Sequence, residues 1–358
     1  MKFSGIFITL YDKETLALYL EKGVYGFLMS PLRGEISPYS KHYNALADYA
    51  CVRHDSHVFF FLKRRIYYGG QILGSAGHGA FYLNGNTSPI GEECNAPLVW
   101  DESERYEPTK EPGVFLLDIG GNKVERAQPY IILFEDKLGM RGLHISSDRL
   151  YFELGKYGFP LPSNSIQNMG FCTLTPGEVD ILLKLLNNEG KPEKLPKIRF
   201  ETNIADTPKP FSPELGIMNL RNGFEKSLFV NEAHLEFSII SNPNLLPNFA
   251  RPKPNDIICR QVPISPFKPF NMDRADICYY SSEEQVHSMI PNTVIELKNT
   301  RANNSAIKQV VRYLDWLHLI CENNEAENVR VFVLAPSFTS TIKVNNYEYQ
   351  IELISVSS

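Results

Sequence analysis

NTVIELKNTRANNSAIKQVVRYLDWL, residues 292–317, places two opposite charges in a short apolar run and follows them with a helix-like pattern. Alternate side chains of a strand point to opposite faces, so Val294, Glu296 and Lys298 share one face. Burying a carboxylate and an ammonium is costly unless the two groups pair or hold a metal ion. The helix pattern that follows carries a polar stripe beside its apolar face, made of Gln309, Arg312, Tyr313 and Trp316.

Three further carboxylates are spaced to meet this charged strand. Asp276 lies in RADICYY, a strand pattern that we expect to pair with the strand carrying Glu296. Glu232 and Glu236 are four residues apart in a helix pattern and therefore share a helical face. Carboxylates that converge with a lysine at a sheet end suit a magnesium site. There the metal lowers the pKa of water, and the lysine holds the attacking water or offsets the charge of the scissile phosphate.

The E-x-K motif alone is common, and a surface ion pair with Asp276 in a turn is the simpler interpretation of it. The order of segments is more specific. The acidic helix NEAHLEFSIISNPNLL precedes DRADICYY, and VIELKN, AIKQVVRYLDWL and VRVFVLAPSF follow. This order resembles the PD-(D/E)xK nuclease superfamily, and more closely its NucS-type branch of mismatch endonucleases, over residues 228–337.

The resemblance implies a restriction-endonuclease-like α/β domain with a central mixed sheet. It also implies hydrolysis of DNA phosphodiester bonds with Mg²⁺, for which Mn²⁺ can substitute. Carried over residue by residue, it makes Asp276 and Glu296 the metal ligands and Lys298 the catalytic lysine. The supporting residues that it implies are Gln309, Tyr313 and a helix acid, either Glu232 or Glu236.

The stretch 251–275, RPKPNDIICRQVPISPFKPFNMDRA, departs from the family pattern. It holds five basic residues against two acidic ones, which fits either a DNA-contacting insertion or a solvated loop. Arg274 in this stretch and Arg312 in the helix are the candidate nucleic-acid contacts of this half.

Short strand patterns bounded by Gly, Asn and Asp dominate the amino-terminal half and predict a small mixed β-barrel. HVFFFLKRRIYYGG, with PYIILFEDKLGMRGLHIS further on, resembles PUA-like domains of the EVE or ASCH kind. That resemblance implies nucleic-acid recognition, including capture of a flipped modified base. The candidate contacts are Lys63, Arg64, Arg65 and Tyr67. For any single aromatic residue there, a place in the barrel core is the favoured alternative.

The expected architecture is therefore α/β, with a PUA-like recognition domain over residues 1–186 and a nuclease domain over 225–358. Residues 187–224, rich in Pro, Asn, Lys and Gly, are expected to be a linker. The glycine-rich GSAGHGAFYLNGN lacks the Gly-Lys-Ser/Thr of a phosphate-binding loop, so we expect no ATPase motor in this chain.

Composition limits the cellular setting. The six cysteines are scattered without a CxxC pair, which favours reduced thiols and a cytoplasmic protein. No segment has the pattern of a signal peptide or a membrane span. The net charge of −5 gives no global attraction to nucleic acid, so any DNA-binding charge must be arranged locally.

These patterns predict a magnesium-dependent DNA endonuclease in restriction or anti-phage defence, with modified DNA as a candidate target. Mismatch or structure-specific repair cleavage is the alternative enzyme role. A nucleic-acid-binding protein with an inactive nuclease fold is the alternative of another class. Cutting both strands usually needs two active sites, so a homodimer is expected.

Overall fold

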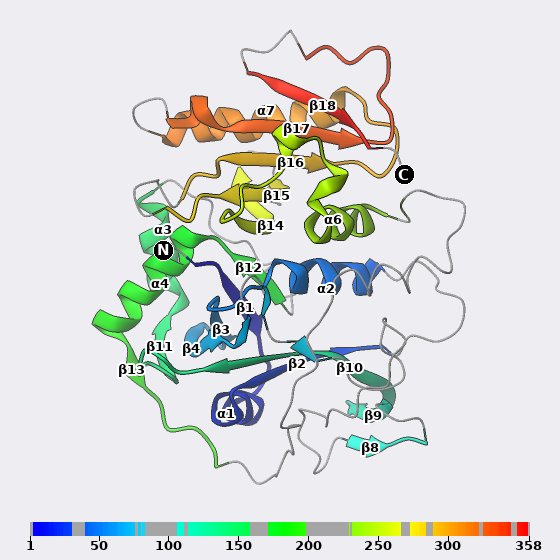
Figure 1. The fold of residues 1–358 in the computed structure, drawn as a ribbon. Coiled ribbons are helices and arrows are strands. Elements are labelled where there is room, and N and C mark those ends of the chain that lie inside the picture. Colours follow the sequence, from blue (N-terminus) through cyan, green and yellow to red (C-terminus); the bar gives the residue numbers. More distant parts are fainter. Residues whose placement is uncertain are drawn as a thin grey trace.

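The computed structural model of the 358-residue chain has two α/β halves stacked on one another (Figure 1). None of the described helices is both long and apolar enough to cross a membrane. The residues that the structure describes are 3–30, 40–75, 78–79, 81–82, 106–110, 114–157, 171–197, 229, 231–265, 273–283, 289–321, 325–344 and 349–356.

The amino-terminal half is built on an eleven-stranded mixed sheet that bends into half of a barrel. Its main path runs β12-β1-β3-β4-β10-β9-β8, and the other four strands branch from β4, β10 and β11. The strands are β1 (Gly5–Thr9), β2 (Val24–Met29), β3 (His57–Leu62), β4 (Arg65–Ile72), β7 (Phe81–Tyr82), β8 (Tyr106–Pro108), β9 (Val114–Ile119), β10 (Asn122–Glu135), β11 (Leu143–Ser146), β12 (Phe171–Leu174) and β13 (Lys191–Pro192). A separate two-stranded ribbon pairs β5 (Gly74–Ser75) with β6 (His78–Gly79). The PUA-like resemblance stays a prediction.

Local signals fix the helices of this half. Asp12 caps α1 by accepting from the amide of Thr15, 2.7 Å away. Thr175 and Glu178 form a capping box at the start of α4. The hairpin between β3 and β4 turns through Lys63 and Arg64, which both have positive φ. Among the described residues, the helices of this half are α1 (Lys13–Lys22), α2 (Ser40–Cys51), α3 (Ser147–Gly155) and α4 (Pro176–Glu189).

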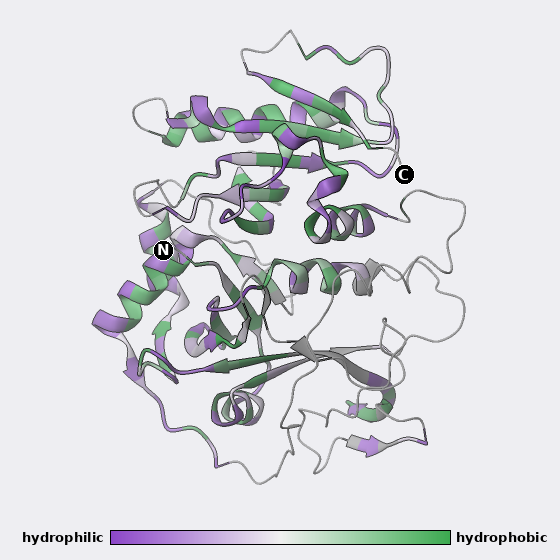
Figure 2. Cartoon of the chain, in the orientation of Figure 1, coloured by the Kyte–Doolittle hydropathy of each residue, from purple (hydrophilic) through white to green (hydrophobic). Residues whose placement is uncertain are grey.

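The carboxyl-terminal half is a five-stranded sheet in the order β14-β15-β16-β17-β18. The first three strands are antiparallel neighbours, and β16, β17 and β18 run parallel. Figure 2 shows hydrophobic residues along most of β17 and both kinds of residue along α7, as expected for a buried strand and an amphipathic helix. The elements are α6 (Glu232–Ser241), β14 (Ile257–Ser265), β15 (Asp273–Tyr280), β16 (Thr293–Leu297), α7 (Asn304–Ile320), β17 (Arg330–Ala335) and β18 (Ile351–Ser355), with short 3-10 turns at Pro243–Leu245, Asn248–Ala250 and Glu325–Asn328.

The two faces of this sheet carry different cores. Ile295 and Leu297 of β16 lie in the cluster that includes α6, whereas Val294 lies in the cluster that includes α7. This alternation confirms the expected division of the strand into two faces. Glu296 therefore lies on the α7 side, where its Oε2 is 3.1 Å from the hydroxyl of Tyr313. Lys298 follows the last residue of β16 and reaches Glu232 at the start of α6.

The structure corrects two of the predictions. Residues 257–265 are not a solvated loop: they form β14, a mostly buried strand that pairs with β15. Helix α4 continues to Glu189, and β13 pairs with β11, so 187–192 belong to the amino-terminal half. Residues 198–224 of the predicted linker lie outside the described residues, and the domain boundaries stay predictions.

The halves meet over α2 and β12 on one side and α6 and β14 on the other (Figure 1). One apolar cluster runs through both, joining Leu46 of α2 to Phe237 of α6. The hydroxyl of Thr173 on β12 accepts from the amide of Arg260 on β14 at 3.1 Å and donates to its carbonyl at 3.1 Å. The halves therefore share a core.

Candidate active site

Asp276 on β15 and Glu296 on β16 lie on neighbouring strands of the carboxyl-terminal sheet. Ile277 of β15 pairs with Ile295 of β16, so one residue further on Asp276 comes level with Glu296. One oxygen of Asp276 accepts from the backbone amide of Leu297 at 2.7 Å. The antiparallel register thus brings together two carboxylates that are twenty residues apart in the chain.

The pKa values of both carboxylates are raised by burial and by a neighbouring carboxylate. Burial, followed by the charge of Glu236, raises the pKa of Asp276 to about 7. Burial and the charge of Asp276 raise the pKa of Glu296 to about 8. Two carboxylates in this position resist ionising together, and a cation between them would relieve the repulsion.

Lys298 lies beside this pair at the end of β16. Its Nζ is 2.7 Å from Oε1 of Glu296 and 3.5 Å from Oε1 of Glu232 at the start of α6. Burial lowers the pKa of the Lys298 amine, but the charges of Glu296, Asp276 and Glu232 outweigh it and raise the pKa overall. The side chain is one-quarter exposed, so it carries a charged group that a solvent-borne substrate can reach.

Helix α7 supplies the predicted supporting residues. The hydroxyl of Tyr313 lies 3.1 Å from Oε2 of Glu296 and 2.6 Å from the carbonyl oxygen of Arg274. Gln309, one turn earlier, donates to that hydroxyl at 2.6 Å. Burial and the charge of Glu296 raise the pKa of Tyr313, so the hydroxyl keeps its proton. The i, i+4 spacing read from the sequence therefore fixes the orientation of the Glu296 carboxylate.

The two helix acids have different environments. Glu232 is about half exposed and faces Lys298. Glu236, one turn further along, is buried and pairs with the guanidinium of Arg260, whose Nε is 3.0 Å from its Oε1. Of the two, Glu232 is the helix acid that reaches the lysine.

The predicted nucleic-acid contacts of the amino-terminal half are only partly on the surface. Lys63, Arg64 and Arg65 are exposed and line a groove of about 750 Å³, together with Arg149 and Lys191. Arg64 pairs with Asp148 at 2.8 Å, and Arg65 pairs with Glu193 at 2.9 Å. Much of the positive charge of this groove is therefore already balanced.

The structure corrects the predicted nucleic-acid contact at Tyr67. Its side chain is 1% exposed and its hydroxyl donates to Glu193, so it is a core residue and not a base-stacking contact. Arg274 is half-buried, and Arg312 binds the buried Asp273 through Nε at 2.7 Å and Nη2 at 3.1 Å. Arg312 therefore holds β15 against α7 and has limited freedom to contact DNA.

Sequence reasoning missed two neighbours of this site, Arg260 and Gln261. Both lie in β14, inside the stretch that was expected to be an insertion or a loop. Arg260 is buried between Glu236 and Asp48, and Gln261 contacts Asp276. The available signal was the apolar pattern of IICRQVPIS, which is typical of a strand whose polar centre needs buried partners.

The donors fit a hard divalent cation. Within the ranges that the structure describes, no three His, Cys, Asp or Glu side chains gather as a metal-binding group. Magnesium commonly binds through one or two carboxylates and completes its shell with water and substrate phosphate oxygens. Asp276 and Glu296, all-oxygen and mutually repulsive, match that mode.

No family model and no curated protein matches the chain. Three solved structures show similarity. Apo EndoMS is 14% identical with a TM-score of 0.24, and the match covers 71% of this chain and 64% of that chain, just under two-thirds. An EndoMS–dsDNA complex is 12% identical with a TM-score of 0.25, covering 94% and 98%. A repair endonuclease from Pyrococcus abyssi is 14% identical with a TM-score of 0.24, covering 93% and 100%. Scores of this size establish neither a shared fold nor a shared activity.

Proposed function

We propose that the protein is a magnesium-dependent DNA endonuclease that hydrolyses phosphodiester bonds. The observation that carries the proposal is the placement of Asp276 and Glu296 at one level of the sheet with the Lys298 amine beside them. A buried glutamate and a half-buried aspartate, both with raised pKa values and both next to a reachable lysine, are typical of a catalytic site. The resemblance of five ordered segments to PD-(D/E)xK nucleases supports DNA as the substrate.

Each residue has a defined part in this proposal. Asp276 and Glu296 would hold the metal, which when bound lowers the pKa of water and offsets charge on the phosphate. Tyr313 and the Leu297 amide keep the two carboxylates oriented. Lys298, held between two carboxylates, is placed to orient the attacking water or to balance charge on the scissile phosphate.

The wider role is also a proposal. Restriction or anti-phage defence, a homodimer that cuts both strands, and a cytoplasmic location are consistent with the family resemblance and the cysteine usage. Mismatch or structure-specific repair remains the alternative role. Digestion of modified, unmodified and mismatched duplexes with end mapping separates these roles, because each predicts a different preferred substrate.

Plasmid cleavage tests the activity itself. Lys298→Met keeps the length of the side chain and removes its charge, so it should abolish cutting without unfolding the protein. Lys308→Met, at an exposed position of α7, is the matched control and should cut like the natural protein. Cleavage should require Mg²⁺ or Mn²⁺ and stop in EDTA.

Three outcomes would count against the proposal. Near-normal cutting by Lys298→Met would reduce the E-x-K motif to an ion pair. Robust cutting in excess EDTA would exclude the metal mechanism. DNA binding without any cutting, in the presence of either metal, would favour a binding protein with an inactive nuclease fold.

A further inference from the structure

Gln261 has an unusual position on β14. Arg260 pairs with Ile277 and Val262 pairs with Ala275, so Gln261 lies opposite Asp276. Gln261 has a φ of 51°, a left-handed conformation that side chains other than glycine rarely adopt. Such a conformation in the middle of a strand calls for a local reason.

The left-handed residue changes which face the side chains occupy. Cys259 lies in the cluster on the α7 side, and regular alternation would return the side chain of Gln261 to that side. Instead, Val262 lies in the α7 cluster, and Arg260 and Gln261 both reach Glu236 of α6. The conformation therefore turns the amide of Gln261 toward Glu236 of α6 and toward Asp276.

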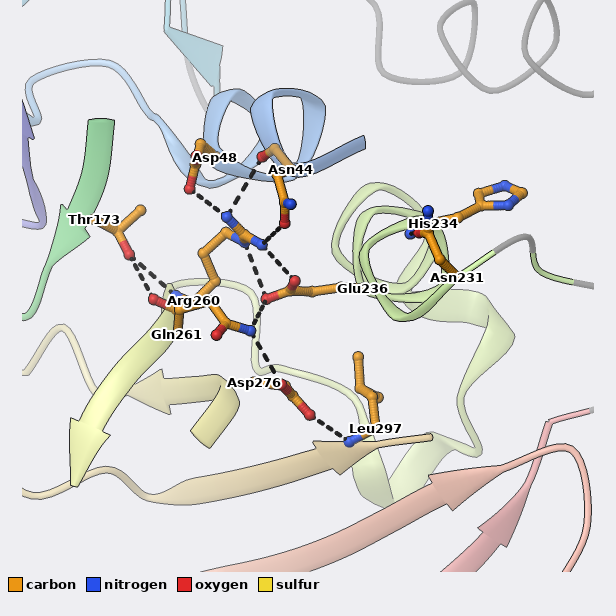
Figure 3. A network of polar contacts seen from close by, with 10 residues as sticks. All are labelled: Asn44, Asp48, Thr173, Asn231, His234, Glu236, Arg260, Gln261, Asp276 and Leu297. Atoms are coloured by element: carbon orange, nitrogen blue, oxygen red, sulfur yellow. Dashed lines mark hydrogen bonds and ion pairs between the residues drawn. The ribbon is translucent and has the colours of Figure 1, made fainter. Parts of the chain in front are cut away.

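That amide joins two carboxylates. Its Nε2 donates to Oδ1 of Asp276 at 3.0 Å and to Oε1 of Glu236 at 3.4 Å (Figure 3). An amide NH₂ has two protons and no charge, so it can bridge two carboxylates where a carboxylate or a thioether cannot. With the Leu297 amide on Oδ2, both oxygens of Asp276 are held.

Glu236, the second carboxylate of this bridge, is itself held by an arginine. Glu236 is fixed by Nε and Nη2 of Arg260, and Nη1 of Arg260 reaches Oδ1 of Asp48 at 2.6 Å. Asn44 on the same helix, α2, accepts from Nη2 at 2.9 Å (Figure 3). A continuous set of contacts thus runs from the amino-terminal half to Asp276.

We propose that Gln261 is a positioning residue for the metal ligand Asp276, anchored through Glu236 and Arg260 to helix α2 of the amino-terminal half. This inference rests on the proposed function, because it assigns a partner to a ligand of the proposed metal. Removing a hydrogen-bond partner of a metal ligand typically weakens metal binding by about 10–100-fold. The amino-terminal half would then contribute to the geometry of the metal site as well as to recognition.

The test measures Mn²⁺ binding to the full-length chain by calorimetry, alongside the Mn²⁺ concentration that gives half-maximal plasmid cutting. Gln261→Met keeps an unbranched side chain of similar length, so its cost in the left-handed conformation is similar, but it cannot donate. The dissociation constant for Mn²⁺ and the Mn²⁺ concentration for half-maximal cutting should both rise about tenfold or more. Saturating Mn²⁺ should restore most of the cutting. Thr173→Val removes the hydroxyl that contacts the backbone of Arg260 and should leave both values unchanged. Asp276→Asn marks complete loss of the site.

Each other outcome overturns the inference. If Gln261→Met binds Mn²⁺ as tightly as the natural protein, the inference fails and the proposed function stands. If the natural protein binds no more Mn²⁺ than Asp276→Asn does, the proposed function fails and the inference with it. If Gln261→Met yields no folded protein, or if Thr173→Val shifts the two values equally, the side chain supports the strand rather than the ligand.

Discussion

Replacing Arg260 by methionine should strongly destabilise the whole protein. Its side chain is 3% exposed, and its guanidinium lies between the carboxylates of Glu236 and Asp48, with Asn44 accepting a further hydrogen bond. Burial lowers the pKa of Arg260, but the two carboxylates raise it well above its ordinary value, so it stays charged. Methionine fills similar space and leaves both acids without a counter-charge.

The expected loss is about 3–5 kcal/mol, the usual cost of removing one partner from a buried ion pair. Against a total stability of about 5–15 kcal/mol, this is a large fraction. Burial already raises the pKa of Asp48 to about 6, with Arg260 opposing that rise. Without the arginine the acids can escape their charge only by binding protons, so the loss should be larger at pH 8 than at pH 5.

Urea unfolding of the full-length chain, followed by circular dichroism at both pH values, measures this loss. Arg149→Met is the matched control, because Arg149 also pairs with two glutamates but its side chain is 36% exposed, so that solvent screens the pairs. The triple variant that adds Asp48→Asn and Glu236→Gln should recover much of the stability, since no charge is then buried. A loss below about 1 kcal/mol at pH 8, or no recovery in the triple variant, would refute the reasoning.

Three further predictions concern single side chains. Burial lowers the pKa of His57 to about 4, opposed by Asp55, so the unfolded chain, with a pKa near 6.5, binds protons first as the pH falls. Relative to His57→Phe, the natural protein should thus lose up to about 3 kcal/mol of stability between pH 6.5 and 4, as measured by urea unfolding of both proteins at both pH values. Tyr313→Phe should reduce cutting about tenfold or more, because it loses the hydroxyl beside Glu296; unchanged turnover in a plasmid assay would contradict this role. Thr175→Ala should lower the free energy of unfolding by about 1 kcal/mol through loss of the capping box, and an unchanged urea midpoint would show that the cap contributes nothing.

Local patterns made much of the carboxyl-terminal half predictable. The apolar positions of α7 recur at helical spacing, and the alternation of β16 assigns Glu296 and Lys298 to one face. The cap at Asp12 and the capping box at Thr175 are equally local, since each depends on residues three apart. These features follow from backbone geometry that a short window of sequence determines.

The role of β14 was not predictable in the same way. Its apolar run is interrupted by Arg260 and Gln261, whose polar side chains suggested a surface segment. Their partners are far away in the chain: Glu236 is 24 residues from Arg260, and Asp48 is 212 residues away. Burial of an arginine becomes favourable only when tertiary packing brings those acids to it.

The sequence by itself determined the strand pattern of β16 and the helix pattern of α7, and it placed Glu296, Lys298, Gln309 and Tyr313 on matching faces through the fixed periods of strand and helix. Only the tertiary structure decided which groups meet. The antiparallel register sets Asp276 level with Glu296, the packing of α6 sends Glu232 to the lysine and Glu236 to Arg260, and the docking of α2 completes the buried network. The physical reason is that periodicity acts over a few residues, whereas burial of charge depends on partners brought together from distant parts of the chain.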